Sequence, residues 1–418
     1  MNTKSINKLE IGASFLLLST YIGTFSVRQP IMSDGKLIGI TSPSIIELVL
    51  GDLAYIIIPI LILLRWKQFL FVVTRDIFPL LISLIVILSI SWSVISNEIV
   101  NDVMGLVRTI IFAAYLATRY KRQDLMTLLA WSLGITAIFS VFVVLFVPGY
   151  GIYDQVYWSG IFGHKNHLGA PMALSSVIFF SLAFSRSKYK KLLWTFFVIS
   201  SCLVFLSGSG GAIVNCVITI SLIPLSKFIK KSEIRKQILL FNFGLISCSL
   251  LSFLLIVNAE GLLGLLGKDL TFTGRTRIWP VVIHYIRQKP LLGYGYASFW
   301  RSEYGDVFRD GFFWEEIPHS HNGFLEILLG LGILGFIIFV ASFFIATFRA
   351  IHIAYLSKTV EELLPIQLLV FIFIANSSEA TLLSSNNIFL IVYISILLSL
   401  AVEIRYLALA KKRLHLKY

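Results

Sequence analysis

Two histidines late in the chain carry the clearest signal for proton chemistry. His319 and His321 flank Ser320 directly before a long apolar segment, in the sequence HSHNGFLE. An imidazole at the boundary between water and lipid can accept a proton near neutral pH, so His321 is a candidate general base. We expect His321 to begin the following helix, and Asn322 to orient either its imidazole or a sugar hydroxyl. His319 is expected to shape the loop, and simple decoration of the interface is the alternative for both histidines.

A basic segment upstream contains a candidate anion site. Residues Thr271 to Lys289 predict a short amphipathic helix that ends before Pro290, because their apolar side chains recur at three- and four-residue steps. Arg275 follows Gly274 at the start of this segment, where N–H groups of the helix end also point outward. Together they would suit a phosphate, with Arg277 close by. The alternative for such a basic helix is a surface anchor at the membrane interface.

A second polar cluster has the sequence GHKNHLG. His164, Lys165, Asn166 and His167 enter an apolar segment together, and two histidines three residues apart share a helix face. Lys165 is a candidate phosphate or sugar contact, with His164 and Asn166 beside it. These histidines could form a metal site with His319 and His321, or with Glu315 and Glu316. Two histidine pairs alone do not define a zinc site, so we expect no metal. A polar helix start without function is the remaining alternative.

One arginine lies inside an apolar segment. Charges in lipid are costly and are usually paired or functional. Arg108 could pair with Glu47 or Asp52 as a structural lock, or it could bind the anion of a substrate.

The elements that must position these residues are membrane helices. The chain is 57% hydrophobic and 14% charged, with a mean hydropathy of +0.86. Apolar runs of about twenty residues match a bilayer core, and about twelve of them recur along the chain. They are centred near residues 18, 55, 86, 110, 136, 176, 199, 219, 248, 336, 371 and 396. We therefore expect an all-α membrane protein with a single polytopic domain, residues 1–418, and one large external loop, residues 258–322.

The distribution of charge sets the orientation. The net charge of +13 does not indicate nucleic acid, because the basic residues gather in alternate short loops. This positive-inside pattern predicts that both termini are cytoplasmic and that residues 258–322 lie outside. Cys202, Cys216 and Cys248 fall within expected spans and indicate no disulfide framework.

Two common signatures are missing from the sequence. It contains no D-x-D carboxylate pair to hold a nucleotide sugar through a metal, and no G-x-x-x-x-G-K-[ST] loop for ATP. The energy for any reaction must therefore come from the substrate or from a gradient.

The motifs together resemble the O-antigen ligase and polymerase superfamily, especially its exopolysaccharide-polymerase branch. Four pieces carry the resemblance: GHKNHLG at 163–169, LSGSGGA at 206–212, TGRTRIW with PLLGYG at 273–295, and HSHNGFLE with GILG at 319–335. The resemblance implies a fold of the multi-spanning GT-C glycosyltransferase type. It also implies a glycan donor on undecaprenyl diphosphate and a metal-independent, inverting transfer without a cofactor.

The same resemblance assigns roles to single residues. Arg275 matches the family's loop arginine, expected at the diphosphate, and His321 matches its histidine, expected at the acceptor hydroxyl. Many members carry an arginine where this chain has Gly210, so one diphosphate contact is absent. Arg108, Lys165 or Arg277 would have to replace it.

These expectations lead to a polysaccharide polymerase in the bacterial inner membrane. It would join lipid-linked repeat units on the external face, with Trp300 and neighbouring aromatics offering flat faces for sugar rings. Its expected partners are the lipid-linked donor and acceptor, membrane lipids, a chain-length regulator and a flippase, and not nucleic acid. The alternatives are an O-antigen ligase with lipid A core as acceptor, or a flippase or transporter for lipid-linked glycans. A transporter would place its charged site near the bilayer midplane, whereas these motifs lie at the external edge.

Overall fold

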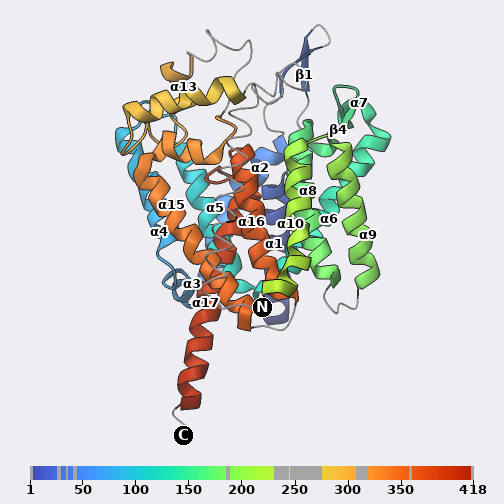
Figure 1. Ribbon diagram of the computed structural model, residues 1–418, viewed down its shortest axis with the longest axis vertical. Coiled ribbons are helices and arrows are strands. Elements are labelled where there is room, and N and C mark those ends of the chain that lie inside the picture. The colour runs from blue at the N-terminus through green and yellow to red at the C-terminus, as the bar shows by residue number, and fades with distance from the viewer. Residues whose placement is uncertain are drawn as a thin grey trace.

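The computed structural model describes residues 3–25, 30–33, 36–40, 45–184, 189–229, 275–306, 319–356 and 360–415, together with residue 244. The chain is mostly helical (Figure 1). The α-helices are α1 (Thr3–Ile22), α2 (Ile45–Leu64), α3 (Trp66–Val73), α4 (Phe78–Leu88), α5 (Val100–Arg119), α6 (Arg122–Phe146), α7 (Pro148–Gly151), α8 (Lys165–Phe184), α9 (Lys190–Leu206), α10 (Gly210–Ile229), α13 (Arg275–Gln288), α15 (Gly323–Leu356), α16 (Leu364–Ser378) and α17 (Ile388–His415). Short 3₁₀ turns are η1 (Ser89–Trp92), η2 (Gly160–Phe162), η3 (Phe299–Arg301) and η4 (Val360–Leu363), and two small antiparallel hairpins pair β1 (Pro30–Ser33) with β2 (Lys36–Ile40) and β3 (Ile152–Tyr153) with β4 (Tyr157–Trp158).

Six of the described helices are long and apolar enough to cross a membrane: α2, α5, α6, α8, α15 and the part of α17 over Ile388–Ala410. A seventh span is possible if α3 and the α4–η1 segment, which meet at 88°, count as one broken crossing. This confirms a multi-pass, helical membrane protein by length and composition. Of the other expected spans, those near 219 and 371 form shorter apolar helices, and those near 18 and 199 form α1 and α9. The run near 248 lies outside the described residues, so the total of about twelve spans stays a prediction.

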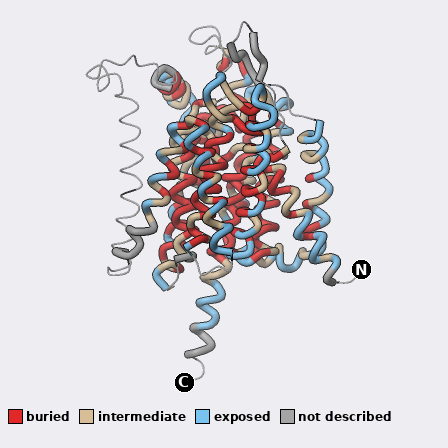
Figure 2. The backbone as a smooth tube through the Cα atoms, turned by 90° about the vertical axis from the view of Figure 1, so that its right-hand side faces the viewer, coloured by how far each residue is buried: buried red, intermediate tan, exposed pale blue. Residues whose placement is uncertain are grey.

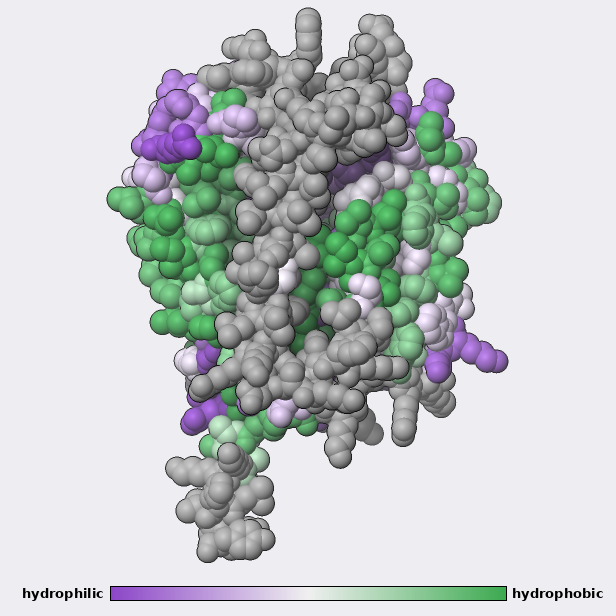
Figure 3. All heavy atoms as spheres, in the orientation of Figure 1, coloured by the Kyte–Doolittle hydropathy of each residue, from purple (hydrophilic) through white to green (hydrophobic). Residues whose placement is uncertain are grey.

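The surface is apolar where a bilayer would surround it. Among the described residues seen in Figure 3, hydrophobic ones lie at the middle height on both sides of the view, and hydrophilic ones gather toward the upper and lower ends. Large apolar side chains such as Ile56, Phe142 and Ile337 are more than half exposed. Buried residues fill the interior between the helices (Figure 2). Lipid is the solvent that suits such an exposed apolar belt.

The helices run roughly along the long axis of the molecule, and both termini lie at the same end (Figure 1). The opposite end carries α13, which lies across the top of the bundle, together with the β1–β2 hairpin. At the centre, α17 packs against α5, α15 and α16. Leu390, Tyr393 and Leu397 of α17 are fully buried there. The expected membrane topology requires both termini on one side, and this arrangement meets that requirement.

The PLLGYG and GILG motifs meet at a break in α15. Gly332 leaves the helical conformation, with φ of 63° and ψ of −166°. The segment from Pro290 to Gly295 lies against the break and bonds to it through the backbone: Ile333 N–H donates to Pro290 O at 2.8 Å, and Tyr294 N–H donates to Leu329 O at 2.9 Å. A Cβ at Gly332 would come within 2.3 Å of the Leu291 backbone. Glycine is therefore needed for this close approach, which satisfies the polar groups that the broken helix frees.

Buried ion pairs tie distant helices together. Glu10 of α1 accepts hydrogen bonds at 2.7–2.8 Å from Arg65, which precedes α3, and from Arg119 at the end of α5. Arg122 of α6 is 7% exposed and pairs with Glu362 of η4 and with Glu403 of α17. Arginines that lie near the ends of apolar helices are thus neutralised by carboxylates from other helices.

Candidate active site

The loop between His319 and Asn322 is held in one conformation by its own polar groups. The Asn322 side-chain oxygen accepts hydrogen bonds from the backbone N–H groups of Phe324 and Leu325, at 3.0 and 3.2 Å. Asn322 is therefore the N-cap of α15, which begins at Gly323 and not at His321 as expected from the sequence. None of the described hydrogen bonds joins the Asn322 amide to the His321 imidazole. His321 itself adopts a left-handed backbone conformation, with φ of 51°, which is unfavourable for a residue with a Cβ and persists only when its surroundings enforce it.

Two tryptophans from the upstream loop and one glutamate enforce this conformation. The indole N–H of Trp279, on α13, donates to Ser320 O at 2.9 Å. Trp300 donates through its indole N–H to one oxygen of Glu326 at 2.7 Å, and the other oxygen accepts the Ser320 backbone N–H at 3.0 Å. The helix α13 thus docks onto the start of α15 through the loop that presents the histidines. Trp300 was expected to offer a flat face to sugar rings, and its indole N–H is used in the hydrogen bond to Glu326.

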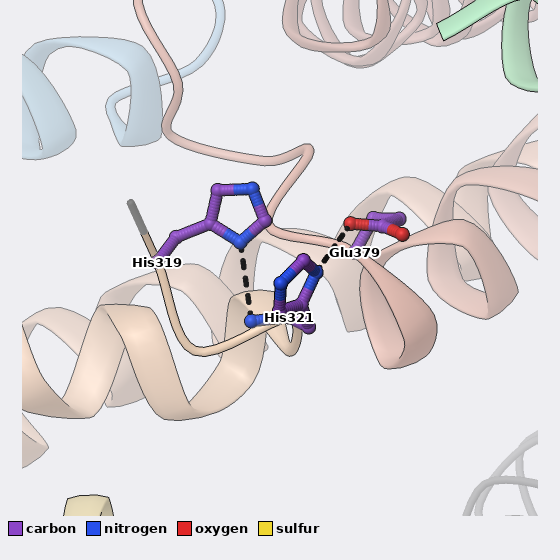
Figure 4. Close-up of side chains that lie close together, drawn as sticks. All are labelled: His319, His321 and Glu379. Carbon is purple, nitrogen blue, oxygen red and sulfur yellow. Dashed lines mark hydrogen bonds and ion pairs between the residues drawn. The ribbon is translucent and has the colours of Figure 1, made fainter. Parts of the chain in front are cut away.

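The His321 imidazole points toward a carboxylate from another helix (Figure 4). His321 Nδ1 lies 3.0 Å from Glu379 Oε2, just beyond the end of α16. The second carboxylate oxygen accepts a hydrogen bond from the Asn166 side-chain amide at 3.3 Å. His319 Nδ1 accepts the backbone N–H of His321 at 3.2 Å, so His319 supports the turn (Figure 4). The fold therefore brings the histidine loop, the GHKNHLG motif and the end of α16 together.

These residues lie at one large cavity. It has a volume of about 1940 Å³ and is lined by residues from α1, α2, α5, α8, α13, α15 and α17 and from the loops around them. Its polar lining includes Glu47, Asp52, Asp102, Arg108, His164, Asn166, His167, Trp300, Arg301, His319, His321, Glu326, Glu379 and Asn386. A cavity of this size can hold a ligand larger than a drug-sized molecule, since pockets for such molecules have volumes of roughly 300–1,000 Å³.

The two other candidate histidines lie at the start of α8. His164 Nδ1 accepts the Asn166 backbone N–H at 3.2 Å, and the imidazoles of His164 and His167 lie with their centroids 5.2 Å apart and their planes tilted by 56°. Burial, followed by the nearby His167, lowers the pKa of His164 to about 4. His164 is therefore neutral near pH 7 and serves as an acceptor that shapes the helix start.

Lys165 is placed differently from the expectation. Its ammonium lies over the Tyr157 ring, 4.1 Å from the ring centroid, and Lys165 is not among the residues that line the cavity.

Arg275 is the first residue of α13, so the predicted short helix is present. The side chains of Arg275 and Arg277 lie outside the described residues, and their proposed contacts stay predictions.

Arg108 lines the cavity and is 9% exposed. It donates to Gly51 O at 2.7 Å and to the Asn386 side-chain oxygen at 2.6 Å, and it lies over the Tyr55 ring at 4.0 Å. None of the salt bridges among the described residues includes Arg108. Of the two alternatives for Arg108, the lock with Glu47 or Asp52 is therefore not among the described ion pairs, and the described hydrogen bonds go to neutral groups.

One residue that sequence reasoning passed over completes the site. Glu379 ends the polar run Asn376 to Glu379 at the close of an apolar segment. That polar run was a visible signal, but nothing in the sequence connects position 379 with position 321. Donor atoms of His319, His321 and Glu379 all lie within 4.8 Å of one another, so these three residues are also the described group that could hold a metal ion.

Comparison with known proteins agrees with the motifs. The O-antigen ligase family profile matches residues 195–340. Residues 195–340 are therefore similar to the O-antigen ligase family, and the resemblance seen in the sequence is confirmed.

Three similar proteins illustrate the range of relatives. A ComP-specific O-oligosaccharyltransferase of Acinetobacter baylyi is 30% identical over 175 residues, which cover 40% of this chain and 32% of the relative. The exopolysaccharide production protein ExoQ of Rhizobium meliloti is 36% identical over 84 residues, covering 18% of this chain and 19% of ExoQ. A putative polysaccharide ligase of Rickettsia conorii is 44% identical over 69 residues, covering 16% and 17%. The alignments thus cover less than a third of each relative's length.

Proposed function

We propose that this protein is a glycosyltransferase that moves a glycan from undecaprenyl diphosphate to the hydroxyl of an acceptor sugar. The observation that carries the proposal is the His321–Glu379 contact at the wall of the large cavity. A histidine oriented by a carboxylate is a common arrangement for proton abstraction from a hydroxyl. The match of residues 195–340 to the O-antigen ligase family supports this reaction class.

The contact with Glu379 defines which imidazole nitrogen can act. An ionised carboxylate only accepts hydrogen bonds, so the neutral imidazole carries its proton on Nδ1 and leaves Nε2 unprotonated. Nε2 of His321 takes the proton of the acceptor hydroxyl as its oxygen attacks the anomeric carbon. The bond to the carrier diphosphate breaks, and the diphosphate leaves with the electron pair. Attack from the opposite side inverts the anomeric centre, and the Glu379 carboxylate stabilises the imidazolium that forms.

The leaving diphosphate needs positive charge. We assign this role to Arg275, at the first turn of α13, because a guanidinium and the N–H groups of a helix start both favour phosphate oxygens. Arg277 is the second candidate on the same turn. No metal is proposed to take part, and none is required by this scheme.

The acceptor decides between two activities. We favour a polymerase that extends a repeat-unit chain in the bacterial inner membrane, with the cavity on the external face and both termini in the cytoplasm. An O-antigen ligase is the second candidate, favoured by the names of the Rickettsia relatives. Glycans from a deletion strain separate the two: loss of a polymerase leaves single repeat units, whereas loss of a ligase leaves long chains on the carrier lipid.

The orientation in the membrane has its own test. A cysteine placed at position 303 should react with an impermeant reagent without rupture of the inner membrane, and failure to react would reverse the orientation.

The decisive experiment compares two purified variants with lipid-linked substrate. His321→Ala should transfer glycan on the order of a hundred- to ten-thousand-fold more slowly than the wild type. His319→Ala should be milder, because the hydrogen bond described for its ring is to a backbone N–H of the turn, whereas His321 Nδ1 lies 3.0 Å from Glu379. A His321 variant with near wild-type turnover, or a His319 variant that alone is inactive, would contradict the assignment of the base.

A further inference from the structure

Two imidazoles and a carboxylate meet at one point of the cavity wall (Figure 4). His319, His321 and Glu379 each offer one donor atom there, and these atoms all lie within 4.8 Å of one another. In a tetrahedral zinc site, bonds of about 2.0–2.2 Å place the donor atoms roughly 3.4 Å apart. The most separated pair therefore needs to close by roughly 1.4 Å at most, a shift that rotation of the side chains provides.

The three side chains are oriented by neighbours that are not themselves in the group. The backbone between the two histidines is held on both sides, by the indole N–H of Trp279 and by the carboxylate of Glu326. This turn brings the two imidazole centroids to 4.3 Å. Asn166 donates to Oε1 of Glu379 at 3.3 Å, and Oε2 of the same carboxylate faces His321. Supporting hydrogen bonds of this kind orient the ligands of metal sites.

The group is open to cations from the cavity. Its three residues are partly exposed and lie on the cavity wall. Among the described lining residues, carboxylates outnumber arginines: Glu47, Asp52, Glu98, Asp102, Glu326 and Glu379 against Arg108 and Arg301. A concave wall with an excess of negative charge raises the local concentration of cations.

The donor types select the kind of cation. Imidazole nitrogen is a ligand for zinc and other late transition metals, whereas magnesium and calcium prefer sites made of oxygen alone. Two histidines with one carboxylate and an open fourth position form a known donor set for an accessible zinc ion. The fourth position here faces the cavity, where water or a hydroxyl would complete the coordination.

We propose that His319, His321 and Glu379 bind a zinc ion that inhibits glycan transfer. The site follows from the geometry, and the inhibition rests on the proposed function, in which His321 is the base. Zinc on Nδ1 places the proton of the neutral ring on Nε2, and zinc on Nε2 occupies the lone pair of that nitrogen. Either arrangement leaves the imidazole unable to take the proton of the acceptor hydroxyl. Zinc therefore blocks the reaction and takes no part in it, and a chelator restores transfer.

Binding is measured on chelator-treated full-length protein without a histidine tag, by titration with zinc chloride and with cobalt chloride as a spectroscopic probe. The wild type should bind a single zinc ion and give the visible absorption of tetrahedral cobalt. His319→Ala and Glu379→Gln should each weaken zinc binding by more than about tenfold, because loss of even a supporting partner costs roughly 10- to 100-fold in affinity. His284→Ala is the matched control, since His284 is an exposed histidine of α13 that bonds to Gln288.

The control variant should bind zinc as the wild type does, and magnesium chloride should not compete. Zinc should also raise the melting temperatures of the wild type and of His284→Ala, and not those of the other two variants. Wild type that binds no zinc, or binding that His319→Ala and Glu379→Gln both retain, would overturn the site.

Inhibition is measured as the ratio of transfer rates with and without zinc chloride, each variant being compared with its own zinc-free rate. Zinc should inhibit the wild type and His284→Ala reversibly, whereas His319→Ala should need at least about tenfold more zinc for the same effect. Transfer that zinc accelerates, or equal inhibition of His319→Ala, would overturn the inhibitory role. Zinc binding at the three residues of a protein that transfers no glycan would support the site and refute the proposed function.

Discussion

The contact between His321 and Glu379 allows one prediction to be worked out in numbers. The perturbation is Glu379→Gln, which keeps the size of the side chain and an oxygen able to accept the Nδ1–H. What it removes is the negative charge that stabilises the imidazolium once the acceptor proton has been taken. The turn that holds His321 should be preserved, because Trp279, Glu326 and Asn322 fix it and none of them contacts Glu379 through a described hydrogen bond.

The expected magnitude follows from the distance of 3.0 Å between the two groups. Two unit charges at this distance interact by about 1.4 kcal/mol at a dielectric constant of about 80, and by about 2.8 kcal/mol at about 40. Dielectric constants between about 40 and about 80 apply here, because the side chains of His321 and Glu379 are 29% and 25% exposed and face a solvated cavity. We therefore expect a ten- to hundredfold loss of turnover, since about 1.4 kcal/mol corresponds to tenfold.

The assay is transfer from lipid-linked substrate by purified protein, with Glu303→Gln as control because Glu303 is exposed and not among the cavity-lining residues. The double variant His321→Ala/Glu379→Gln should be no slower than His321→Ala alone, since the carboxylate acts through the imidazole. Full activity in Glu379→Gln, or losses that multiply in the double variant, would refute this reasoning.

Three further predictions concern other groups of the site. Arg275→Lys should lose most activity although the charge is kept, because a point charge cannot replace a planar fork; near-normal polymer from Arg275→Ala at normal protein levels would exclude the role. The pKa of His164 is lowered from 6.5 to about 4, so the unfolded chain binds more protons than the native state between these values and stability falls as pH drops through this window. The melting temperature of His164→Gln should therefore decrease less between pH 6.5 and pH 4 than that of the wild type, with exposed His284→Gln as control, and identical slopes would argue against the lowered pKa. Glycan transfer should continue in excess chelator, whereas activity lost on stripping and restored by zinc would make His319, His321 and Glu379 a catalytic metal site.

The sequence was sufficient for features that depend on local composition. Runs of apolar residues long enough for a bilayer predicted a multi-pass helical protein, and the structure confirms this because a helix satisfies its own backbone polar groups in lipid. The short helix beginning near Arg275 was likewise predicted from its spacing of apolar residues and its proline stop. The predicted start of α15, at His321, was wrong by two residues. Asn322 caps the helix through its side chain, so the helix begins at Gly323, and His321 lies outside it in a left-handed conformation.

The sequence by itself determined the membrane character of the chain, the family of its motifs and the two histidines worth testing. These follow from residue types, which act through hydrophobicity, charge and local spacing. Only the tertiary structure decided that Glu379 and Asn166 meet His321, that Lys165 lies over Tyr157, and that Arg108 bonds Gly51 and Asn386 and not a carboxylate. Positions 166, 321 and 379 are far apart in the chain, so their contact depends on how whole helices pack. That packing is fixed by many buried apolar side chains acting together, and no local pattern records it.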